Sequence, residues 1–558
     1  MYNYSLENQT IKLYKNTPWI EFVNKNNIPI YYKEIQFNID EPAYFIAKCS
    51  QCGCVFHSKK SCFNHLCHPI INTNSNRIQF ALIYLINWIC IKMISINAIM
   101  HPFFQKFCSF LNDDFKIPKP KKMRSLIINY SKIIIENLIK NMKSSYVSIM
   151  IDGAKRWKHR YISIILYTRY EYVYYETRQV YRENAEAISN FLNDCMHYLD
   201  SHGKKLCSIC SDDYTANIKA CKFKNLDYKI YRQYCNCHCA SLAIGHQFSI
   251  VGKNCFFTKQ IELALRLLKH LNPPFLTCVR WQSISECTNF IYEHFDEMKD
   301  IINKKRKNVA ETYSDLLKID WLSIKNATQI ITSFIIFIEG DEMKIELLFL
   351  KLYETVSLLK NENTQIANDL LVEFCNLFEQ KTDLIVAVSA FLLTYEGSQF
   401  WMKNSEDLKE YYLSKGWSGI TKYCESSNIS VTDEMHQCFI EHLSSSLNVK
   451  MDPFEFWKSK DNELSEVACK ILSIPCSETP VERLFGGLSF MLDPSSTKMK
   501  SDLINAEMTI RMSTIFQNIH NFDGNMLSKL EKSFEFFQDY AFPEVSYMLS
   551  NKMSNQDI

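Results

Sequence analysis

Glycine is scarce in this sequence, and so are the loops that bind nucleotide phosphates. The 558 residues include 12 glycines, and none of them stands in a Walker A loop or a dinucleotide-binding fingerprint. Such loops need glycine where the backbone approaches a phosphate closely. The sequence therefore gives no support for chemistry driven by a nucleotide.

An excess of charge is also missing. The formal net charge is +2, so any contact with nucleic acid must use local basic patches and not a global field. Hydrophobic residues make up 47% of the chain, which is enough for well-formed cores and argues against wholesale disorder. At this length we expect about three to four domains.

Neither a secretion signal nor a membrane span is evident. The start, "MYNYSLENQTIKLYKN", has no apolar core, so the 22 cysteines are expected to be reduced thiols of a cytosolic or nuclear protein, some of them at a metal site. The longest apolar run, 78–100, is interrupted by Gln79, Asn87, Lys92 and Asn97. A lysine near the middle of a span is costly in hydrocarbon. We therefore predict a buried helix there and no membrane partner.

At Tyr146 the spacing of the hydrophobic residues changes from a helical to a strand pattern, and a mixed α/β region begins. The segments "YVSIMIDG", "YISIILYTRY" and "YEYVYYETRQVY" predict a three-stranded antiparallel meander. An amphipathic helix, the buried strand "KLCSIC", a second helix and the strand "DYKIYRQYC" follow. The predicted order is β-β-β-α-β-α-β, which is the order of the RNase H-like fold.

From about residue 240 to 470 the strand signal nearly vanishes and helical patterns dominate. The predicted fold class is α/β plus all-α, with a small N-terminal zinc finger. The family resemblance set out below from its motifs implies that the helical block is a large insertion that interrupts an RNase H-like domain. With that implication the expected boundaries are 1–72 for the finger segment, 73–144 for a helical linker and DNA-binding region, 145–240 for the RNase H-like core, 241–450 for the insertion, 451–515 for a C-terminal dimerisation region that completes the core, and 516–558 for a helical tail.

Two aspartate sites follow predicted strands. The first strand ends at Asp152, and the fourth ends at Asp212–Asp213. If these strands are parallel neighbours, both acids leave the same carboxyl edge of the sheet, where open α/β sheets place their sites. Clustered carboxylates require a cation, here Mg²⁺ or Mn²⁺, and two such ions suit phosphoryl transfer. The alternative is that these aspartates merely end a strand and cap a helix.

A third carboxylate, Glu482, lies far along the chain in "IPCSETPVERLFGGLSF". Its simplest interpretation is a capping box, with Thr479 as N-cap, Pro480 at N1 and Glu482 at N3. The alternative is a third metal ligand. The two interpretations are compatible, because the start of a helix can hold the side chain rigidly.

Six motifs in order resemble those of hAT superfamily DNA transposases. They are "HPFFQKFCSFLNDDFKIPKPKKMRSLI", "SIMIDGAKRWKHRYISIILY", "CSDDYTANIKA", "YCNCHCASLA", "TCVRWQSI" and "DPFEFWKSKDNELSEVACKILSIPCSETPVERLFGG". The resemblance covers most of the chain. It departs from the family pattern where "DGAKRW" replaces Asp-Gly-Trp and "ERLFGG" replaces Glu-Arg-x-Phe-Ser, but neither change removes a carboxylate.

The resemblance implies a catalytic triad and an activity. It assigns the first acid to Asp152, the second to Asp213 (through the Asp-x-x-x-Asn element that ends at Asn217), and the third to Glu482. It implies an all-α insertion between the last strand and the helix that bears the glutamate. Such enzymes cut both strands at element ends, form hairpins on the flanking DNA, and join the excised ends to a target.

Two further family elements carry expected roles. In the Arg-Trp element, Arg280 and Trp281 are implied to contact DNA, with the tryptophan stacking on a flipped base. The alternative for Trp281 is an ordinary buried aromatic. In the Cys-x-x-His element, Cys235 and His238 either help a local structural site or simply pack together.

The N-terminal cluster "CSQCGCVFHSKKSCFNHLCH" predicts a zinc site. Cys49, Cys52 and His65 have the spacing of a ββα finger, and the fourth ligand is His68 or Cys67. The spacing resembles a BED finger, although its last two ligands are closer than is usual. The alternative is a set of scattered core cysteines.

Basic residues supply the remaining predictions. The run "KRWKHR" provides Lys155, Arg156, Lys158 and Arg160 beside Asp152, where they can bind the DNA backbone. The run "KKRK" at 304–307 is either a nuclear localisation signal or a solvated helix end.

Three functions remain open at this point. The first is a nuclear, homodimeric or higher-order DNA transposase that uses Mg²⁺ or Mn²⁺ and a zinc finger on double-stranded DNA. The second is a domesticated, non-catalytic DNA-binding regulator of the same ancestry. The third is a zinc-bearing scaffold that binds only proteins, which needs no acidic cluster.

Overall fold

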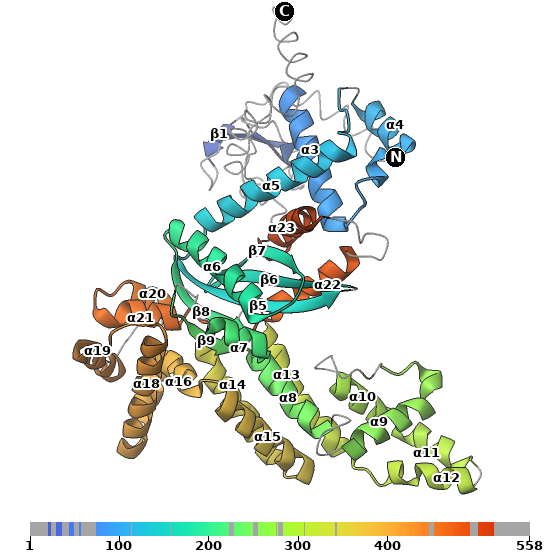
Figure 1. Ribbon diagram of the computed structural model, residues 1–558, viewed down its shortest axis with the longest axis vertical. Coiled ribbons are helices and arrows are strands. Elements are labelled where there is room, and N and C mark those ends of the chain that lie inside the picture. Colours follow the sequence, from blue (N-terminus) through green and yellow to red (C-terminus); the bar gives the residue numbers. More distant parts are fainter. Residues whose placement is uncertain are drawn as a thin grey trace, which may run out of the picture. The chain divides into compact units, whose positions relative to one another are not determined.

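The computed structural model describes residues 20–23, 29–35, 44–49, 55–56, 74–112, 114–156, 158–222, 228–248, 255–274, 276, 283–305, 307–340, 343–445, 451–491 and 500–517. They fall into two compact units, one that runs up to Asn129 and one that spans Tyr130–Gln517. Figure 1 shows the labelled elements of both units.

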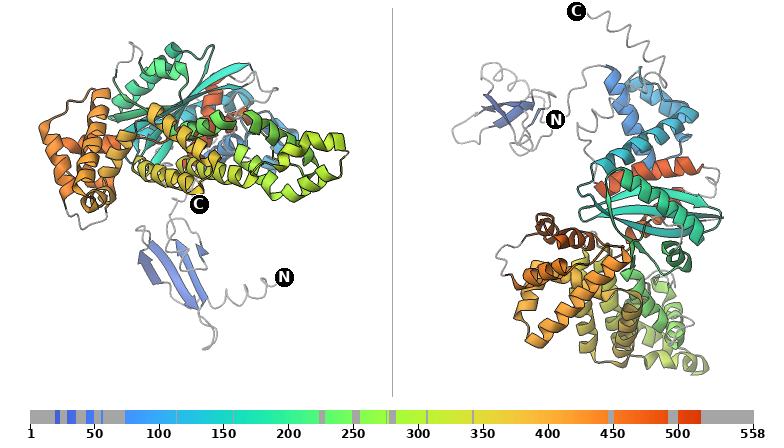
Figure 2. Two further views of the ribbon diagram at one scale, coloured as in Figure 1. Left: turned by 90° about the horizontal axis from the view of Figure 1, so that it is seen from below. Right: turned by 60° about the vertical axis from the view of Figure 1, so that its left-hand side comes forward.

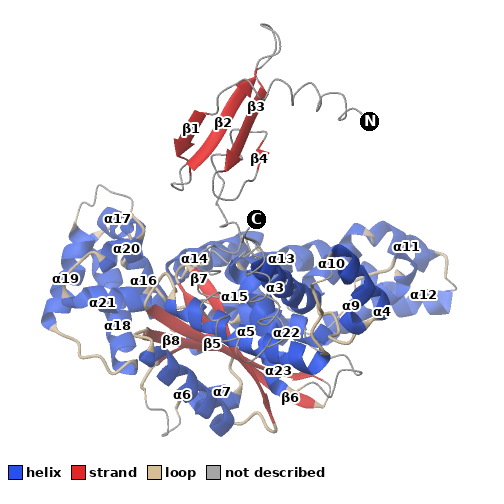
Figure 3. Ribbon diagram, turned by 90° about the horizontal axis from the view of Figure 1, so that it is seen from above, coloured by secondary structure: helices blue, strands red, loops and turns tan. Residues whose placement is uncertain are grey.

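The first unit contains a small sheet and three helices. Its strands pair antiparallel in the order β1-β2-β3-β4, with bounds Ile20–Val23, Pro29–Ile35, Tyr44–Cys49 and Val55–Phe56 (Figure 3). The helices are α3 (Asn74–Lys92), α4 (Pro102–Leu111) and the first half of α5 (Pro120–Lys140), and the short 3-10 helix η1 (Ala98–Met100) lies between α3 and α4.

The apolar run 78–100 is shorter as a helix than predicted. α3 ends at Lys92, and Met93 takes a left-handed conformation that closes it. One face of α3 is buried through Leu82, Ile86 and Ile89, but Tyr84 is 59% exposed. The predicted buried helix thus packs through one face and exposes the other.

The second unit is built on a five-stranded mixed sheet of order β7-β6-β5-β8-β9. β5 (Tyr146–Arg156), β6 (His159–Thr168) and β7 (Glu171–Val180) are antiparallel neighbours. β8 (Lys205–Ser211) and β9 (Tyr231–Tyr234) are parallel to β5. The helices α6 (Ala185–Ser201) and α7 (Thr215–Cys221) connect them in the predicted β-β-β-α-β-α-β order.

Helices cover both faces of this sheet (Figure 3). Successive residues of a strand point to opposite faces, and β7 shows both contacts. The Tyr174 hydroxyl donates to Oδ1 of Asn505 at 2.7 Å, on α23 (Ser501–Gln517). The ring of Tyr175 packs against Phe191 of α6. The sheet core is therefore enclosed by α6 on one side and α23 on the other.

A helical region follows β9, and between 236 and 444 its described residues form helices and no strand (Figure 2). This matches the predicted all-α insertion. The α-helices are α8 (Asn236–Phe248), α9 (Cys255–Leu267), α10 (Ser283–Glu293), α11 (Phe295–Asn303), α12 (Lys307–Tyr313), α13 (Trp321–Glu339), α14 (Ile345–Glu362), α15 (Gln365–Lys381), α16 (Leu384–Leu392), α17 (Tyr395–Lys403), α18 (Glu406–Ser426) and α19 (Asp433–Ser444). One of them, α13, is long and apolar enough to cross a membrane, but more than half of it is buried in the protein.

After the insertion the chain returns to the sheet. The helices α20 (Pro453–Lys458) and α21 (Glu463–Ile471) precede α22 (Thr479–Met491), which packs on β5 and β6. The segment before α22 is tied down, because Ser148 of β5 donates its hydroxyl to the Ser473 carbonyl at 2.7 Å. This return brings residues from the end of the chain to the first strand of the sheet.

Candidate metal centre at the sheet edge

The parallel pairing of β5 and β8 sets two aspartates side by side. Met150 is the register partner of Cys210, and two residues further along each strand stand Asp152 and Asp212. Asp152 Oδ1 accepts from the backbone N–H of Gly153 at 2.7 Å. Asp212 Oδ1 accepts from Tyr214 N at 2.9 Å and from Asn217 Nδ2 at 2.6 Å. The prediction that the first strand ends at Asp152 is wrong, because β5 continues to Arg156 against β6. The two carboxylates instead lie just beyond the last parallel pair of β5 and β8.

Asp213 points elsewhere. It pairs with the ammonium of Lys381, the last residue of α15. A shift of one residue at a strand end turns a side chain toward the opposite side, so only one of the two consecutive aspartates can face Asp152. The structure gives that place to Asp212, and it also joins Asn217 to Asp212 and not to Asp213. The predicted pair Asp152 and Asp213 is therefore not brought together.

Helix α22 brings two glutamates to the same place. It begins at Thr479, and the Glu478 carbonyl accepts from Val481 N at 2.8 Å. The Thr479 hydroxyl is buried and has no hydrogen-bond partner among the described residues, so it does not act as the N-cap that a capping box requires. Glu482 lies one turn after Glu478, and its side chain is 32% exposed. The helix start positions both carboxylates.

Glu478 is the most deeply buried acid of the group. Its side chain is 0% exposed, its Oε1 pairs with His238 Nδ1 at 3.0 Å, and its Oε2 accepts no hydrogen bond from the described residues. One ligand atom from each of Asp152, Asp212 and Glu478 lies within 4.8 Å of the others. We call Asp152, Asp212, Glu478 and Glu482 the acidic cluster.

His238 connects the two glutamates. It lies in the first turn of α8, and its Nδ1 is 3.0 Å from Glu478 Oε1 while its Nε2 is 3.6 Å from Glu482 Oε1. Cys235 immediately precedes α8, and its Sγ lies within 4.8 Å of ligand atoms of His238 and Glu478. The predicted pair Cys235 and His238 is thus brought together and gains a third member, Glu478.

The electrostatics of the cluster favour a cation. Burial, and then the charges of Glu478 and Asp212, raise the pKa of Asp152. Burial raises the pKa of Glu478 to about 7 and that of Glu482 to about 7, although His238 lowers both. Burial lowers the pKa of His238, but contacts with Cys235 and Glu478 outweigh it and raise that pKa to about 12. One imidazolium cannot neutralise four carboxylates.

An open cleft of about 1000 Å³ gives access to the cluster. Asp152 and Glu482 line it together with the predicted basic residues Lys155 and Arg156. Arg483 also lines it and donates to the Glu339 carbonyl of α13 at 2.7 Å. The lining of the cleft combines these cations with acids, which also include Glu286 and Glu339; the cations can attract a polyanion, and the acids can hold a metal.

Two more of the predicted DNA-contact residues lie in the described part of the chain. Lys158 is exposed, and Arg160 is paired with Glu183 at 3.5 Å. Arg280, Trp281, Cys52, His65, Cys67 and His68 lie outside the described residues. Cys49 is the last residue of β3, the strand that pairs with β4. In the basic run 304–307, Lys304 is the C-cap of α11, so this run stands at a helix end.

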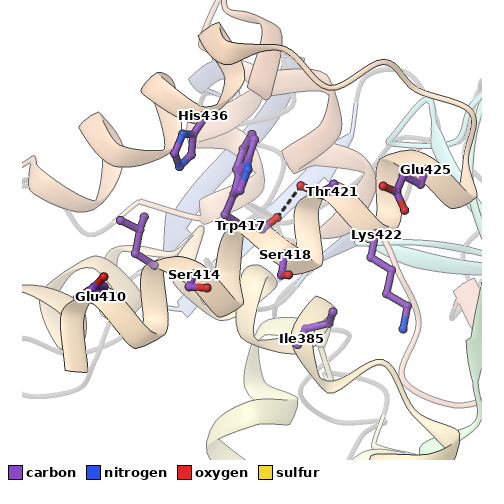
Figure 4. Close-up of a pocket in the computed structure, with 10 residues that line it drawn as sticks. Ile385, Glu410, Ser414, Trp417, Ser418, Thr421, Lys422, Glu425 and His436 are labelled. Atoms are coloured by element: carbon purple, nitrogen blue, oxygen red, sulfur yellow. Dashed lines mark hydrogen bonds between the residues drawn. The ribbon is translucent and has the colours of Figure 1, made fainter. Parts of the chain in front are cut away.

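A second pocket, of about 760 Å³, lies in the insertion (Figure 4). It is lined from α18 and α19 by Trp417 and His436, whose ring centroids are 4.5 Å apart, and by Ser418 and Glu425. None of the metal-ligand groups found among the described residues includes a residue of this pocket. The sheet-edge cleft is thus the better candidate for chemistry.

Sequence reasoning missed Asp212 and Glu478 as members of the cluster. For Asp212 the signal lies in the register of the two parallel strands. Met150 pairs with Cys210, and counting two residues on from each reaches Asp152 and Asp212. For Glu478, in "CSETPVE", a polar neighbourhood suggests a solvated residue, and only the packing of α22 reveals its burial.

Comparison with known proteins gives one family match. The model of the hAT family C-terminal dimerisation region matches residues 434–513, which span α19 to α23 and include Glu478 and Glu482. No curated protein matches the chain.

Proposed function

The chain carries the C-terminal dimerisation region of the hAT family, and on this premise we propose that it is a DNA transposase that cleaves and transfers DNA strands with a divalent metal. The observation that carries the proposal is the convergence of Asp152, Asp212 and Glu478 from distant parts of the chain. The strand and helix order supports an RNase H-like core.

The residues of the cluster fit Mg²⁺ or Mn²⁺. Carboxylate oxygens are the ligands that these hard cations prefer, and Glu478 offers a buried Oε2 without a hydrogen bond among the described residues. Asp152, Asp212 and one or both glutamates would hold the ions. When bound, a pair of such ions activates an attacking oxygen and stabilises a leaving oxygen in phosphoryl transfer.

The chain's own residues position the substrate. Lys155 and Arg156 line the cleft on the β5 side and Arg483 lines it on the α22 side, so they can bind phosphates that flank the scissile bond. His238 holds Glu482 at 3.6 Å and fixes its direction. The extended backbone of β5 and the first turn of α22 keep Asp152 and Glu482 on rigid elements, which preorganises the site.

The remaining parts of the proposal concern DNA and assembly. A zinc finger of Cys49, Cys52, His65 and either His68 or Cys67 would bind transposon ends, and Arg280 and Trp281 would contact the DNA near the cleavage site. The dimerisation region suggests a homodimer or a larger homo-oligomer. Work on chromosomal DNA requires a nuclear location, for which the basic run 304–307 is the proposed signal.

The test compares neighbouring acids. Full-length protein is incubated with supercoiled plasmid and Mn²⁺ or Mg²⁺, with a chelator as the blank, and nicked product is measured. Asp152→Asn and Asp212→Asn should each lower the nicking rate at least about 100-fold, as expected when a group that stabilises the charged transition state is lost. Asp213→Asn is the matched control and should retain activity.

Two outcomes would contradict the proposal. The first is nicking that persists in Asp152→Asn and Asp212→Asn. The second is a chain that binds double-stranded DNA and dimerises but cleaves nothing with either ion, which would assign it to the non-catalytic regulators.

A further inference from the structure

Cys235, His238 and Glu478 offer a mixed set of metal ligands beside the acidic cluster. One sulfur, one ring nitrogen and one carboxylate oxygen lie within 4.8 Å of one another. All three residues lie in the second compact unit, and their positions do not depend on the N-terminal finger. A thiolate, an imidazole and a carboxylate are ligands typical of Zn²⁺, whereas Mg²⁺ prefers oxygen alone.

The backbone holds this set rigidly. The N–H of Cys235 donates to the Ser211 carbonyl at the end of β8, at 3.0 Å. Next to it, Asn236 donates to the Cys476 carbonyl twice, from its backbone N at 3.0 Å and from its side-chain Nδ2 at 2.8 Å. These bonds clamp the start of α8 to the segment that carries Glu478. The three ligands therefore do not need a large movement to approach one ion.

Glu478 supplies the independent sign that a cation belongs there. A buried carboxylate normally accepts hydrogen bonds, because an unpaired buried charge is costly. Both oxygens of Glu478 are buried; Oε1 contacts His238 Nδ1 at 3.0 Å, and Oε2 accepts no hydrogen bond from the described residues. The residue stands between two ligand groups, with Asp152 and Asp212 in one and Cys235 and His238 in the other, so each oxygen can serve a different ion.

The orientation of His238 agrees with a ligand role. Nδ1 faces Glu478 at 3.0 Å, and Nε2 faces Glu482 at 3.6 Å. A metal-bound histidine usually directs its second ring nitrogen to a carboxylate, which fixes the ring. Here Glu482 is that carboxylate.

We propose that Cys235, His238 and Glu478 form a zinc site that shares Glu478 with the acidic cluster. In this proposal the three residues fill three of the four tetrahedral positions of the zinc ion, and the ion would fix α8 against the start of α22 and orient His238 toward Glu482. It is separate from the zinc predicted for the N-terminal finger and from the divalent ions proposed for catalysis.

The test measures metal content in a chain that lacks the finger ligands. Full-length protein with Cys49→Ser and Cys52→Ser is purified, loaded with Zn²⁺ and washed, and its zinc is counted by mass spectrometry. One zinc per chain is expected. Adding Cys235→Ser, or separately Glu478→Gln, should lower the bound zinc at least about 10-fold.

Two controls separate this result from loss of folding and from the catalytic proposal. Cys195→Ser alters a thiol that is equally buried, in α6 and outside the ligand group, and should keep the zinc. Asp152→Asn alters the acidic cluster alone and should also keep it, so loss of nicking and loss of zinc are distinguishable. If Cys235→Ser does not fold, the finger-deficient parent is loaded with Co²⁺, and a thiolate-to-cobalt absorption band is expected.

The proposal fails if the finger-deficient chain binds neither zinc nor thiolate-ligated cobalt. It also fails if Cys235→Ser and Glu478→Gln, both folded, retain a full equivalent. Zinc that is lost equally in Asp152→Asn would place the ion in the acidic cluster and would likewise overturn it.

Discussion

Two groups of charged side chains lie in the second compact unit and differ in how their acids are neutralised. Arg169, in the turn between β6 and β7, has a side chain that is 1% exposed and binds Glu346 at 2.6 Å and Asp452 at 3.0 Å. It also donates to the Leu472 carbonyl at 3.4 Å. The acidic cluster, by contrast, gathers four carboxylates, two of which, Glu478 and Glu482, contact His238.

The pKa values express this difference. Burial raises the pKa of Asp452, but hydrogen bonds and charge from Arg169 outweigh it, and the net pKa is lowered. Burial raises the pKa of Glu478 to about 7, and His238 does not reverse this. Arg169 pairs directly with both of its acids and serves the architecture, whereas the acidic cluster holds more carboxylates than His238 can pair with and is suited to a cation that comes from solution.

The largest effect is expected from removing the fixed cation. Arg169→Met leaves Glu346 buried without its partner, and breaking a buried pair in this way costs about 3–5 kcal/mol. The free energy of unfolding in urea should fall by that amount. The matched control is Arg178→Met, because Arg178 also binds two acids but is 31% exposed, and half-exposed pairs contribute about 1 kcal/mol or less. If Arg169→Met and Arg178→Met lower the free energy of unfolding equally, the buried position of Arg169 does not decide its contribution.

In the acidic cluster, removing a charge is expected to raise the free energy of unfolding. The pKa of Glu478 is raised from 4.5 to about 7 in the folded protein, so the folded state binds more protons than the unfolded state between these values. Metal-free protein should therefore lose stability as the pH rises from about 4.5 to about 7. At pH 8 with chelator, Glu478→Gln should raise the free energy of unfolding by on the order of 1–3 kcal/mol.

Glu507 offers the control for this experiment. It lies on α23, and burial raises its pKa to about 7 as well, but it is in neither ligand group. Glu507→Gln should flatten the pH dependence in the same direction and leave the stabilisation by added Mn²⁺ unchanged. In Glu478→Gln the stabilisation by Mn²⁺ should shrink. A Mn²⁺ response that is the same in both variants would contradict the assignment of Glu478.

The smallest effect is expected at the partly exposed pair of Asp213 and Lys381. Their side chains are 34% and 24% exposed, so the coupling energy from Asp213→Asn, Lys381→Met and the double variant should be below about 1 kcal/mol. A much larger coupling would mean that this pair belongs with the buried network of Arg169.

Much of the sheet could be predicted from the sequence, because its strands differ in period from their surroundings. The meander from Tyr146 to Tyr181 and the buried strand "KLCSIC" have β-rich patterns, and the parallel pairing of β5 with β8 follows from the helix between β7 and β8. These features located the edge at which Asp152 and its partner lie.

The individual acids were harder to predict, for physical reasons. Choosing between Asp212 and Asp213 requires knowing where β8 ends to within one residue, and the spacing to Asn217 favours the wrong neighbour for the observed hydrogen bond. Glu478 is buried only because α22 packs on β5 and because Asn236 binds the Cys476 carbonyl. Contacts between residues that lie 240 positions apart leave no local pattern.

The order of the acids along the chain has a consequence for synthesis. Asp152 and Asp212 leave the ribosome early, whereas Glu478 and Glu482 follow only after the whole helical insertion has been made. A polypeptide that stops before residue 478 therefore contains Asp152 and Asp212 but lacks Glu478, Glu482 and helix α22. The complete ligand set therefore forms only after α22 has been made.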